Sequence, residues 1–389
     1  MVLPVRRHRA AGAVAAGVAA AVFVGCWTLL HHWFYARHQI VDTPVYQGYG
    51  NDIDHGLLPY RDFPVEYPPG ALPVFVAPVY VYGYAGYVQV FGWLMAAFGI
   101  GCIGFAALAG AGRRALAFIA VSPLLIGSMA LSRYDLWPAM FVMAALAALL
   151  HDHHRWGWAA LGAAVAAKGF AVAVVPLAVV WTLRRRGTRE LVVAVAVGAV
   201  VVLAAVLPFV ILAPHGLWHS VRGQLSRPLQ IESLGASLLT TFSHPHVIAT
   251  HGSLNLGGES AVATGTTVLE LVVLVALWVA FARGPATADR FVRYTAACMC
   301  AFVALGKVLS PQFLIWLVPL VPLVRGRRGV AASLLLAGAL IATQVYFPQR
   351  YWEYIFHLHL AWLVLLRNLV LVALLLTLSL PEREPARSS

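Results

Sequence analysis

The feature that most limits the fold of this chain is a series of apolar runs, each about 20 residues long, separated by short segments that hold most of the charge. Only 11% of the 389 residues are charged and 61% are hydrophobic, with a mean hydropathy of +0.80. Ordinary globular domains are about a quarter charged. So few charges cannot cover a water-soluble core, and we expect an all-α, polytopic transmembrane helical bundle forming a single domain over residues 1–389.

The apolar runs predict about twelve membrane spans. The stretch 67–83 is also apolar, but Pro68, Pro69, Pro73 and Pro78 interrupt it, so it is expected to be a short or re-entrant segment. The region 156–183 is expected to form two short helices that meet at Lys168 and Gly169. The predicted spans lie near 11–30, 85–109, 116–131, 136–150, 156–167, 170–183, 190–212, 263–282, 291–306, 312–324, 329–346 and 361–380.

The arginine clusters predict the orientation of the bundle. Most of the 27 lysine and arginine residues fall on one side when both termini are placed in the cytoplasm, as the positive-inside rule requires. The first outer loop then covers 31–66, a long outer loop covers 213–262, and a cytoplasmic tail covers 381–389. We expect a multi-pass protein of the cell membrane with its working surface outside. The net charge of +12 is therefore explained by arginines in the cytoplasmic loops, which set the orientation in the membrane. This distribution excludes nucleic-acid binding.

Acids and aromatic residues are dense in the first outer loop. Asp42 follows the first span by about ten residues, so its carboxylate is expected near the membrane surface, where it could accept a proton from a substrate hydroxyl. The alternative is that Asp42 caps a short interfacial helix, which the following Thr43-Pro44 favours. One residue could do both.

Cations are also expected at outer ends of spans, where burial of charge is costly and favours a functional role. Lys168 and Lys307, the only lysines, have no adjacent acid in sequence, and a lipid phosphate is a natural partner for such a cation. Arg133 and Arg227 could bind a phosphate too, or form structural ion pairs with Asp135 and Glu232. Further candidates for substrate contacts are Tyr46, Tyr60, Arg61, Asp62, Glu66, Tyr67, Asp135, Gln230, Glu232 and Gln312.

The sequence lacks the common motifs of nucleotide-dependent and metal-dependent chemistry. It contains no P-loop and no zinc-hydrolase motif. The run His151-Asp152-His153-His154 favours a solvated inner loop over a metal site. We expect no metal and no cofactor.

Five stretches carry a resemblance to a known family: VDTPVY (41–46), PYRDFPVEYPPGALP (59–73), SRYDLWPA (132–139), QLSRPLQIESLGASLL (224–239) and KVLSPQFLIWLVP (307–319). They resemble the GT-C superfamily of membrane glycosyltransferases and, within it, glycosyltransferase family 87, the polyprenyl-phosphate-mannose-dependent α-mannosyltransferases of actinobacteria. PYRDFPVEYPP is the most specific of them.

The resemblance implies an inverting transfer of a sugar, mannose by analogy, from a polyprenyl-phosphate donor to a lipid-linked or envelope glycan on the outer face of the membrane. It places the catalytic acid at Asp42, as general base. In the mechanism that we then expect, the cations Lys307, Arg227, Arg133 and Lys168 bind the donor phosphate and stabilise its developing charge. Arabinose or glucose remain open as the donor sugar. A transporter or flippase for a lipid-linked or small anionic substrate is the alternative, and a non-catalytic envelope scaffold ranks last.

Overall fold

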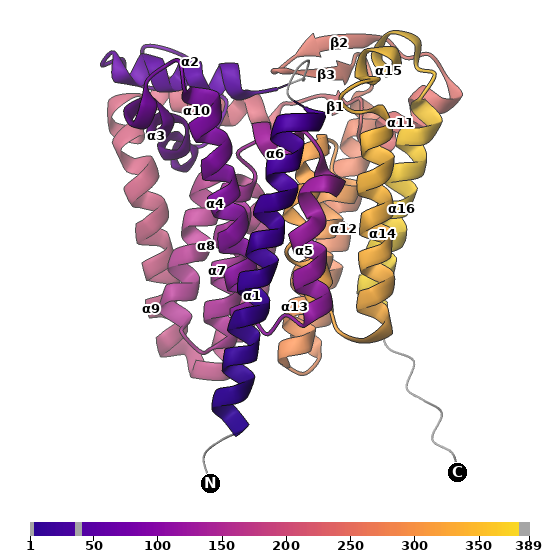
Figure 1. The fold of residues 1–389 in the computed structure, drawn as a ribbon. Helices are drawn as coiled ribbons and strands as arrows, with labels where there is room; N and C mark the ends of the chain where they lie inside the picture. The colour runs from indigo at the N-terminus through magenta and orange to yellow at the C-terminus, as the bar shows by residue number, and fades with distance from the viewer. Residues whose placement is uncertain (1–3, 36–40, 381–389) are drawn as a thin grey trace.

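The fold is a bundle of helices that rise between two opposite faces (Figure 1). The computed structural model describes residues 4–35 and 41–380. Long helices make most of it, and one end of the bundle carries short helices and a small sheet (Figure 1). The long helices are α1 (Pro4–Leu29), α4 (Tyr87–Leu108), α5 (Arg113–Ile126), α7 (Leu136–Leu150), α8 (His154–Ala167), α9 (Val175–Leu212), α12 (Ser260–Arg283), α13 (Ala288–Leu305), α14 (Gly326–Tyr346) and α16 (Ala361–Ser379).

Within the described ranges, six helical segments are each long and apolar enough to cross a membrane. The protein is therefore a multi-pass membrane protein, as the composition predicts. Shorter apolar helices and turns run beside these segments, so the number of spans stays a prediction. The six segments are Gly12–Phe34, Tyr87–Leu108, Gly169–Leu212, Ser260–Arg283, Gly326–Tyr346 and Ala361–Ser379.

The predicted hairpin around Lys168 is present. Helix α8 ends at Ala167, and the chain re-enters through the 3₁₀ turn η3 (Gly169–Val174) before α9 begins. Helix α9 is broken at Gly187, whose φ of 79° is accessible mainly to glycine, and its two halves match the predicted spans 170–183 and 190–212.

Other boundaries differ from the prediction. The predicted span 312–324 is not an α-helix: it consists of the 3₁₀ turns η4 (Pro311–Trp316) and η5 (Val321–Leu323), where Pro311 and Pro322 each remove a backbone donor. The predicted span 116–131 ends at Ile126, because Gly127 has a φ of 69°, and a separate turn of helix, α6 (Met129–Ser132), follows. The segment 67–83 forms the turn η2 (Pro69–Ala71) and the short helix α3 (Leu72–Tyr82).

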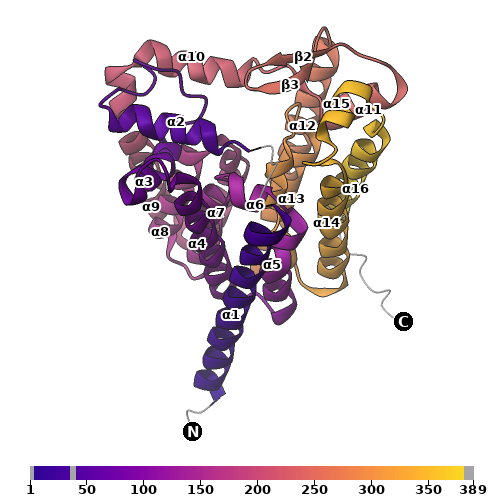
Figure 2. The same cartoon turned by 45° about the horizontal axis from the view of Figure 1, so that its top comes forward.

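One face of the bundle carries nearly all the irregular structure, and we call it the loop face (Figures 1 and 2). Helices α2 (Thr43–Asp54) and α10 (Pro214–Leu225) lie across the ends of the long helices on one side of this face, and α15 (Tyr351–His357) and α11 (Leu234–Phe242) lie on its other side. A three-stranded antiparallel sheet of order β1-β3-β2 completes it. Its strands are β1 (Leu229–Gln230), β2 (Val247–Thr250) and β3 (Ser253–Leu256).

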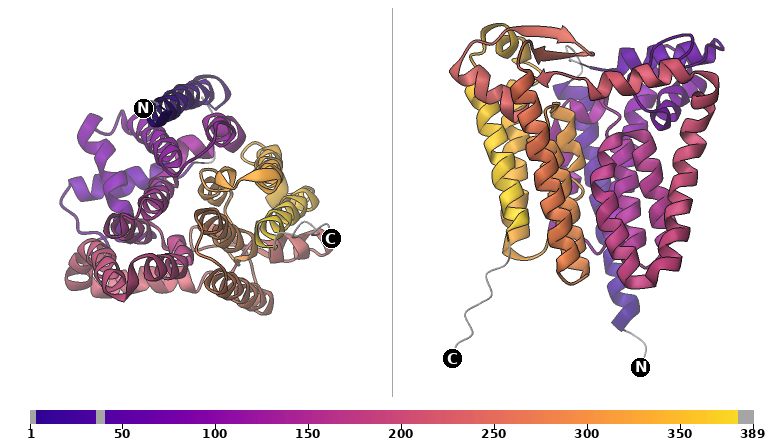
Figure 3. Two further views of the ribbon diagram at one scale, coloured as in Figure 1. Left: turned by 90° about the horizontal axis from the view of Figure 1, so that it is seen from below. Right: turned by 180° about the vertical axis from the view of Figure 1, so that it is seen from behind.

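The helices divide into two groups that the loop face joins. Figure 3 shows α1 to α9 on one side and α12 to α16 on the other, with α10 and the sheet running across between them. The hairpin of β2 and β3 turns at His251 and Gly252, both with positive φ, and the carboxylate of Glu66 lies directly against Gly252. The segment that holds Glu66 therefore contacts a loop almost 200 residues later in the chain.

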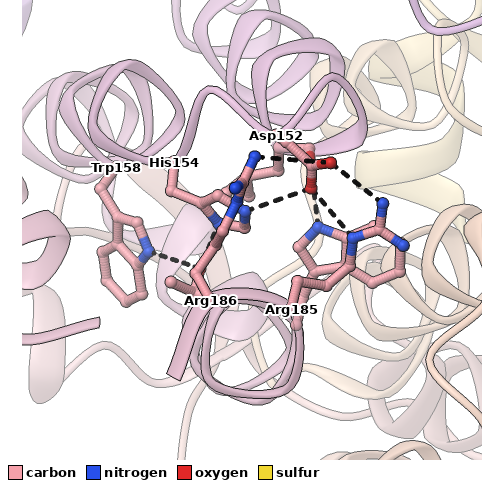
Figure 4. Close-up of polar contacts among 8 residues, drawn as sticks. Asp152, His154, Trp158, Arg185 and Arg186 are labelled. Atoms are coloured by element: carbon pink, nitrogen blue, oxygen red, sulfur yellow. Dashed lines mark hydrogen bonds and ion pairs between the residues drawn. The ribbon is translucent and has the colours of Figure 1, made fainter. Parts of the chain in front are cut away.

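The face opposite the loop face is rich in arginine. The Asp152 carboxylate accepts hydrogen bonds from Arg185 at 2.9 and 3.1 Å and lies 3.7 Å from Arg186 (Figure 4). His154, from the run expected to form a solvated loop, is buried and contacts Asp152 and Thr182. Within the described residues, no three His, Cys, Asp or Glu side chains gather as a metal site. These ion pairs fix the turn between α7 and α8 to α9.

Candidate functional site

The backbone of Asp42 starts helix α2, but its side chain does not cap that helix. The carbonyl oxygen accepts the amides of Val45 and Tyr46 at 3.0 and 3.1 Å, and Pro44 occupies the first turn, where no backbone donor is needed. The carboxylate makes no hydrogen bond to the backbone of α2. It is therefore available for other contacts, and about a quarter of the side chain is exposed.

Arg133 forms an ion pair with Asp42 across 91 residues of sequence. Arg133 sits between α6 and α7 and is almost fully buried, so its pKa is lowered to about 10 by desolvation. The hydroxyl of Tyr46 donates a hydrogen bond of 3.3 Å to the same oxygen of Asp42. A guanidinium and a phenol thus orient one carboxylate oxygen.

An aromatic cluster supports this carboxylate from below. The ring of Tyr46 packs 4.4 Å from that of Phe75, 5.6 Å from Tyr67 and 5.7 Å from Tyr134. Tyr60 donates a 2.6 Å hydrogen bond to the carbonyl of Tyr67. The sequence stretches 41–46, 59–73 and 132–139 therefore meet in this cluster. Tyr46 is positioned by this packing as well as by its helix.

Lys168 is held by an acid rather than left free for a ligand. Its ammonium donates to Asp135 at 2.6 Å, and Trp316 donates to the same oxygen at 2.7 Å. The rings of Tyr134, Trp316 and Phe313 surround the ammonium at 4.6 to 5.3 Å. Burial lowers the pKa of Lys168, while Asp135 raises it. This pair joins the α8–η3 turn to the start of α7 and to η4.

Arg227 and Lys307 line an open cavity of about 500 Å³ on the loop face. Lys307 donates to the carbonyl of Leu225 at 2.9 Å, and Arg227 donates to Ser253 at 2.8 Å. Burial lowers the pKa of both cations, and the positive charge of Arg227 lowers the pKa of Lys307 and of Lys168 further. The walls also include Ser226, Glu259, Ser260, Thr264, Thr267 and Val268.

The four cations predicted to bind a phosphate lie in one region. Lys168 interacts electrostatically with Arg133 and with Arg227, and Arg227 with Lys307. Their surroundings differ, however. Arg133 and Lys168 already have carboxylate partners, whereas Arg227 and Lys307 are the two that line the cavity.

Glu232 is not paired with Arg227, which was one interpretation of the sequence. It is 1% exposed and accepts a 2.7 Å hydrogen bond from Tyr346. Burial raises its pKa to about 7, against the opposing effects of Arg367 and Arg133. The backbone carbonyl of Glu232 accepts from Arg367 and Asn368. Glu232 is therefore not part of the cavity wall. Its contacts instead link the loop face to α16.

The remaining candidates occupy three different environments. Arg61 and Asp62 pair with each other on the exposed surface, and Asp62 also accepts the amide of Leu58. Glu66 is exposed and contributes to the field around Arg227. Gln230 is buried and donates to Ser310 at 2.8 Å. Gln312 is partly buried in η4.

Sequence reasoning missed Glu270 and the surroundings of Arg367. Glu270 lies in the middle of α12, and Arg367 is fully buried in α16. An ionisable residue inside an apolar run is costly in a membrane, so this was the signal that could have found both. The partners Tyr346 and Trp316 carried no such signal, because aromatic residues are common in spans.

Comparison with known proteins assigns the family. The profile of glycosyltransferase family 87 matches residues 65–311, which is more than half of the chain. The chain belongs to glycosyltransferase family 87. The matched region contains the cation-lined cavity, Arg133 and Lys168, and it begins 23 residues after Asp42. No curated protein sequence matches significantly.

A solved structure shows the fold of this family 87 glycosyltransferase. ArnT from Cupriavidus metallidurans, solved with bound undecaprenyl phosphate, is similar with a TM-score of 0.51 at 17% identity. The match covers 93% of this chain and 76% of that one. The prediction of a GT-C-type helical bundle is confirmed, and the protein is a membrane glycosyltransferase.

Proposed function

We propose that this glycosyltransferase moves a sugar, mannose by family resemblance, from a polyprenyl-phosphate donor to a lipid-linked or envelope glycan acceptor. The observation that carries the proposal is the arrangement on the loop face, where the oriented carboxylate of Asp42 lies in the same charged region as a cavity lined by Arg227 and Lys307. A base and a phosphate site are the two elements such a transfer needs. The undecaprenyl phosphate bound to ArnT, a protein of similar fold, supports this donor class.

The reaction is a single displacement. Asp42 takes the proton from an acceptor hydroxyl while that oxygen attacks the anomeric carbon of the donor sugar. The bond between this carbon and the phosphate oxygen breaks, and polyprenyl phosphate leaves with the electron pair. Attack opposite the leaving group inverts the anomeric centre. Phosphate is a good leaving group, so one carboxylate suffices, unlike the acid pair of most glycosidases.

Each cation has its own part in this scheme. Arg227 and Lys307 stabilise the charge that develops on the leaving phosphate. Arg133 orients Asp42 and extends the positive field, and Lys168 holds Asp135 in place below the site. The hydroxyl of Tyr46 donates a hydrogen bond to the carboxylate of Asp42 and so helps Arg133 to orient this base. No step requires a metal or a cofactor.

The loop face is proposed to lie outside the cell. Arginines gather at the opposite face, around the Asp152 network, the Gly187 break and the α12–α13 turn, which the positive-inside rule assigns to the cytoplasm. The cavity opens beside the exposed face of α12, a candidate span, so a lipid-linked donor can reach it from the bilayer. Glycolipid synthesis at the outer surface follows from this orientation.

The test uses purified native protein and the Asp42→Asn variant, each supplied with radiolabelled polyprenyl-phosphate-mannose and a membrane-lipid extract. We expect labelled glycolipid with native protein, and at least about 100-fold less with the variant, since a positioned base contributes 10²–10⁴-fold. Glu353→Gln removes a partly exposed acid of the loop face that pairs with Arg350, so it is the matched control and should retain transfer. Full transfer by Asp42→Asn would remove Asp42 from the role of base.

Replacing the donor separates the remaining alternatives. Parallel assays with polyprenyl-phosphate-arabinose and polyprenyl-phosphate-glucose identify the sugar if mannose is not transferred. Movement of the intact donor between leaflets of a vesicle, without any new glycosidic bond, would indicate a flippase and contradict the transferase proposal.

A further inference from the structure

Glu270 occupies an unusual place for an acid, on the membrane-crossing helix α12. It lies ten residues after Ser260, or about 15 Å along the helix axis. Ala263 and Thr267 line the cavity, and Glu270 follows them by seven and three residues, which puts it on the same side of α12. The carboxylate therefore lies less than one helical turn beyond the cavity wall.

The contacts of Glu270 connect it with the phosphate-binding cations. One carboxylate oxygen lies 3.4 Å from the position that a Cβ atom on Gly306 would take, so it packs against the residue next to Lys307. Glu270 and Lys307 interact electrostatically, and Lys307 interacts in turn with Arg227. The ammonium of Lys307 stays bound to the carbonyl of Leu225. Glu270 thus lowers the positive potential of the cavity without occupying it.

The proposed reaction changes the charge of the phosphate in that cavity. The donor is a phosphodiester with one negative charge, whereas the leaving polyprenyl phosphate is a phosphomonoester with up to two, since its second pKa is about 6. A carboxylate repels a bound phosphate in proportion to the charge of that phosphate. It therefore disfavours the product more strongly than the donor.

Resting on the proposed function, we infer that Glu270 is a specificity-determining residue that makes the cavity prefer a singly charged phosphodiester over a doubly charged phosphomonoester. Glu270 weakens the binding of both, but it weakens that of the spent lipid phosphate more, which favours release of this product over loss of the donor. This preference explains why an acid is kept in an apolar helix beside two cations that must bind an anion. Glu259, which also lines the cavity, is the partly exposed N-cap residue of α12 at the loop face, where solvent screens its charge more than that of Glu270 in the middle of the helix.

The experiment measures binding without catalysis. Native protein, Glu270→Gln and Glu270→Asp are reconstituted in nanodiscs and titrated with decaprenyl phosphate and with its methyl phosphodiester, at a pH about two units above the second phosphate pKa of about 6. We expect Glu270→Gln to bind both ligands more tightly. If the diester gains about threefold, the monoester should gain about ninefold, because the interaction energy doubles with the charge.

The conservative variant and the turnover kinetics complete the test. Glu270→Asp keeps the negative charge but shortens the side chain. It should therefore keep the native ratio of the two affinities if the charge of Glu270 sets that ratio, and change it if packing sets the ratio. In transfer assays Glu270→Gln should show a lower donor KM and stronger inhibition by polyprenyl phosphate. Equal gains for both ligands, or none, with native protein binding both, would overturn the inference. Binding of neither ligand by native protein would instead overturn the proposed donor class, and this inference with it.

Discussion

The ion pair between Lys168 and Asp135 offers a direct test of how the site is held together. Asp135 is fully buried, and its contacts with Lys168 and Trp316 are 2.6 and 2.7 Å long. At 2.6 Å, two unit charges attract by about 6 kcal/mol at an effective dielectric constant of 20, before the cost of desolvation. Removing one partner leaves a buried charge without compensation, which typically costs about 3–5 kcal/mol. Lys168→Met should lower the free energy of unfolding by that amount.

The assay is reversible unfolding in mixed micelles, carried out on four proteins in a double-mutant cycle. Asp135→Asn alone keeps the hydrogen bond from Trp316, and in the double variant neither charge of the pair remains. We therefore expect the double variant to be more stable than Lys168→Met. Arg61→Met removes a cation from the exposed Arg61–Asp62 pair and is the matched control, with an expected loss below about 1 kcal/mol.

One result would refute this reasoning. If Lys168→Met unfolds like the native protein and instead raises the KM for the donor, Lys168 contacts the donor phosphate and does not stabilise Asp135. That outcome would restore the role expected from the sequence. Additive losses in the double variant would show that the two charges do not interact.

Three further predictions concern the loop face. Arg133→Lys should reduce transfer by about 10- to 100-fold, with little change in the free energy of unfolding, because an ammonium cannot reproduce the guanidinium contact that orients Asp42; steady-state kinetics beside an unfolding curve checks this. Gly216→Ala should cost about 1–3 kcal/mol of stability, since its Cβ would overlap the carbonyl oxygen of Tyr60, and a lower unfolding midpoint is the measurement. Burial raises the pKa of Glu232 to about 7, so the folded state binds a proton that the unfolded state releases from its ordinary pKa of about 4.5. Stability should therefore fall as pH rises from about 4.5 to 7, by up to about 3 kcal/mol, and unfolding curves of Glu232→Gln should show a flatter dependence.

The sequence alone determined the membrane character and most of the helical segments. Apolar runs and arginine clusters are local features, and the cost of burying polar groups in lipid allows few alternatives to a helix. The same reasoning placed the hairpin at Lys168, because only a turn there keeps the arginines at 155 and 184–189 on one side. It failed at 312–324, where the hydropathy is that of a span but prolines and packing favour 3₁₀ turns.

The tertiary structure decided which charges meet. Sequence proximity suggested Arg133 with Asp135 and Arg227 with Glu232, yet Arg133 reaches Asp42, and Asp135 is held by Lys168. Ion pairs form between groups that the packing of distant helices brings together, and the hydropathy of a sequence has no information about that register. The sequence therefore determined which residue types stand at the loop face, while only the packing of two helix groups decided that Asp42 would be oriented and that Arg227 and Lys307 would share a cavity.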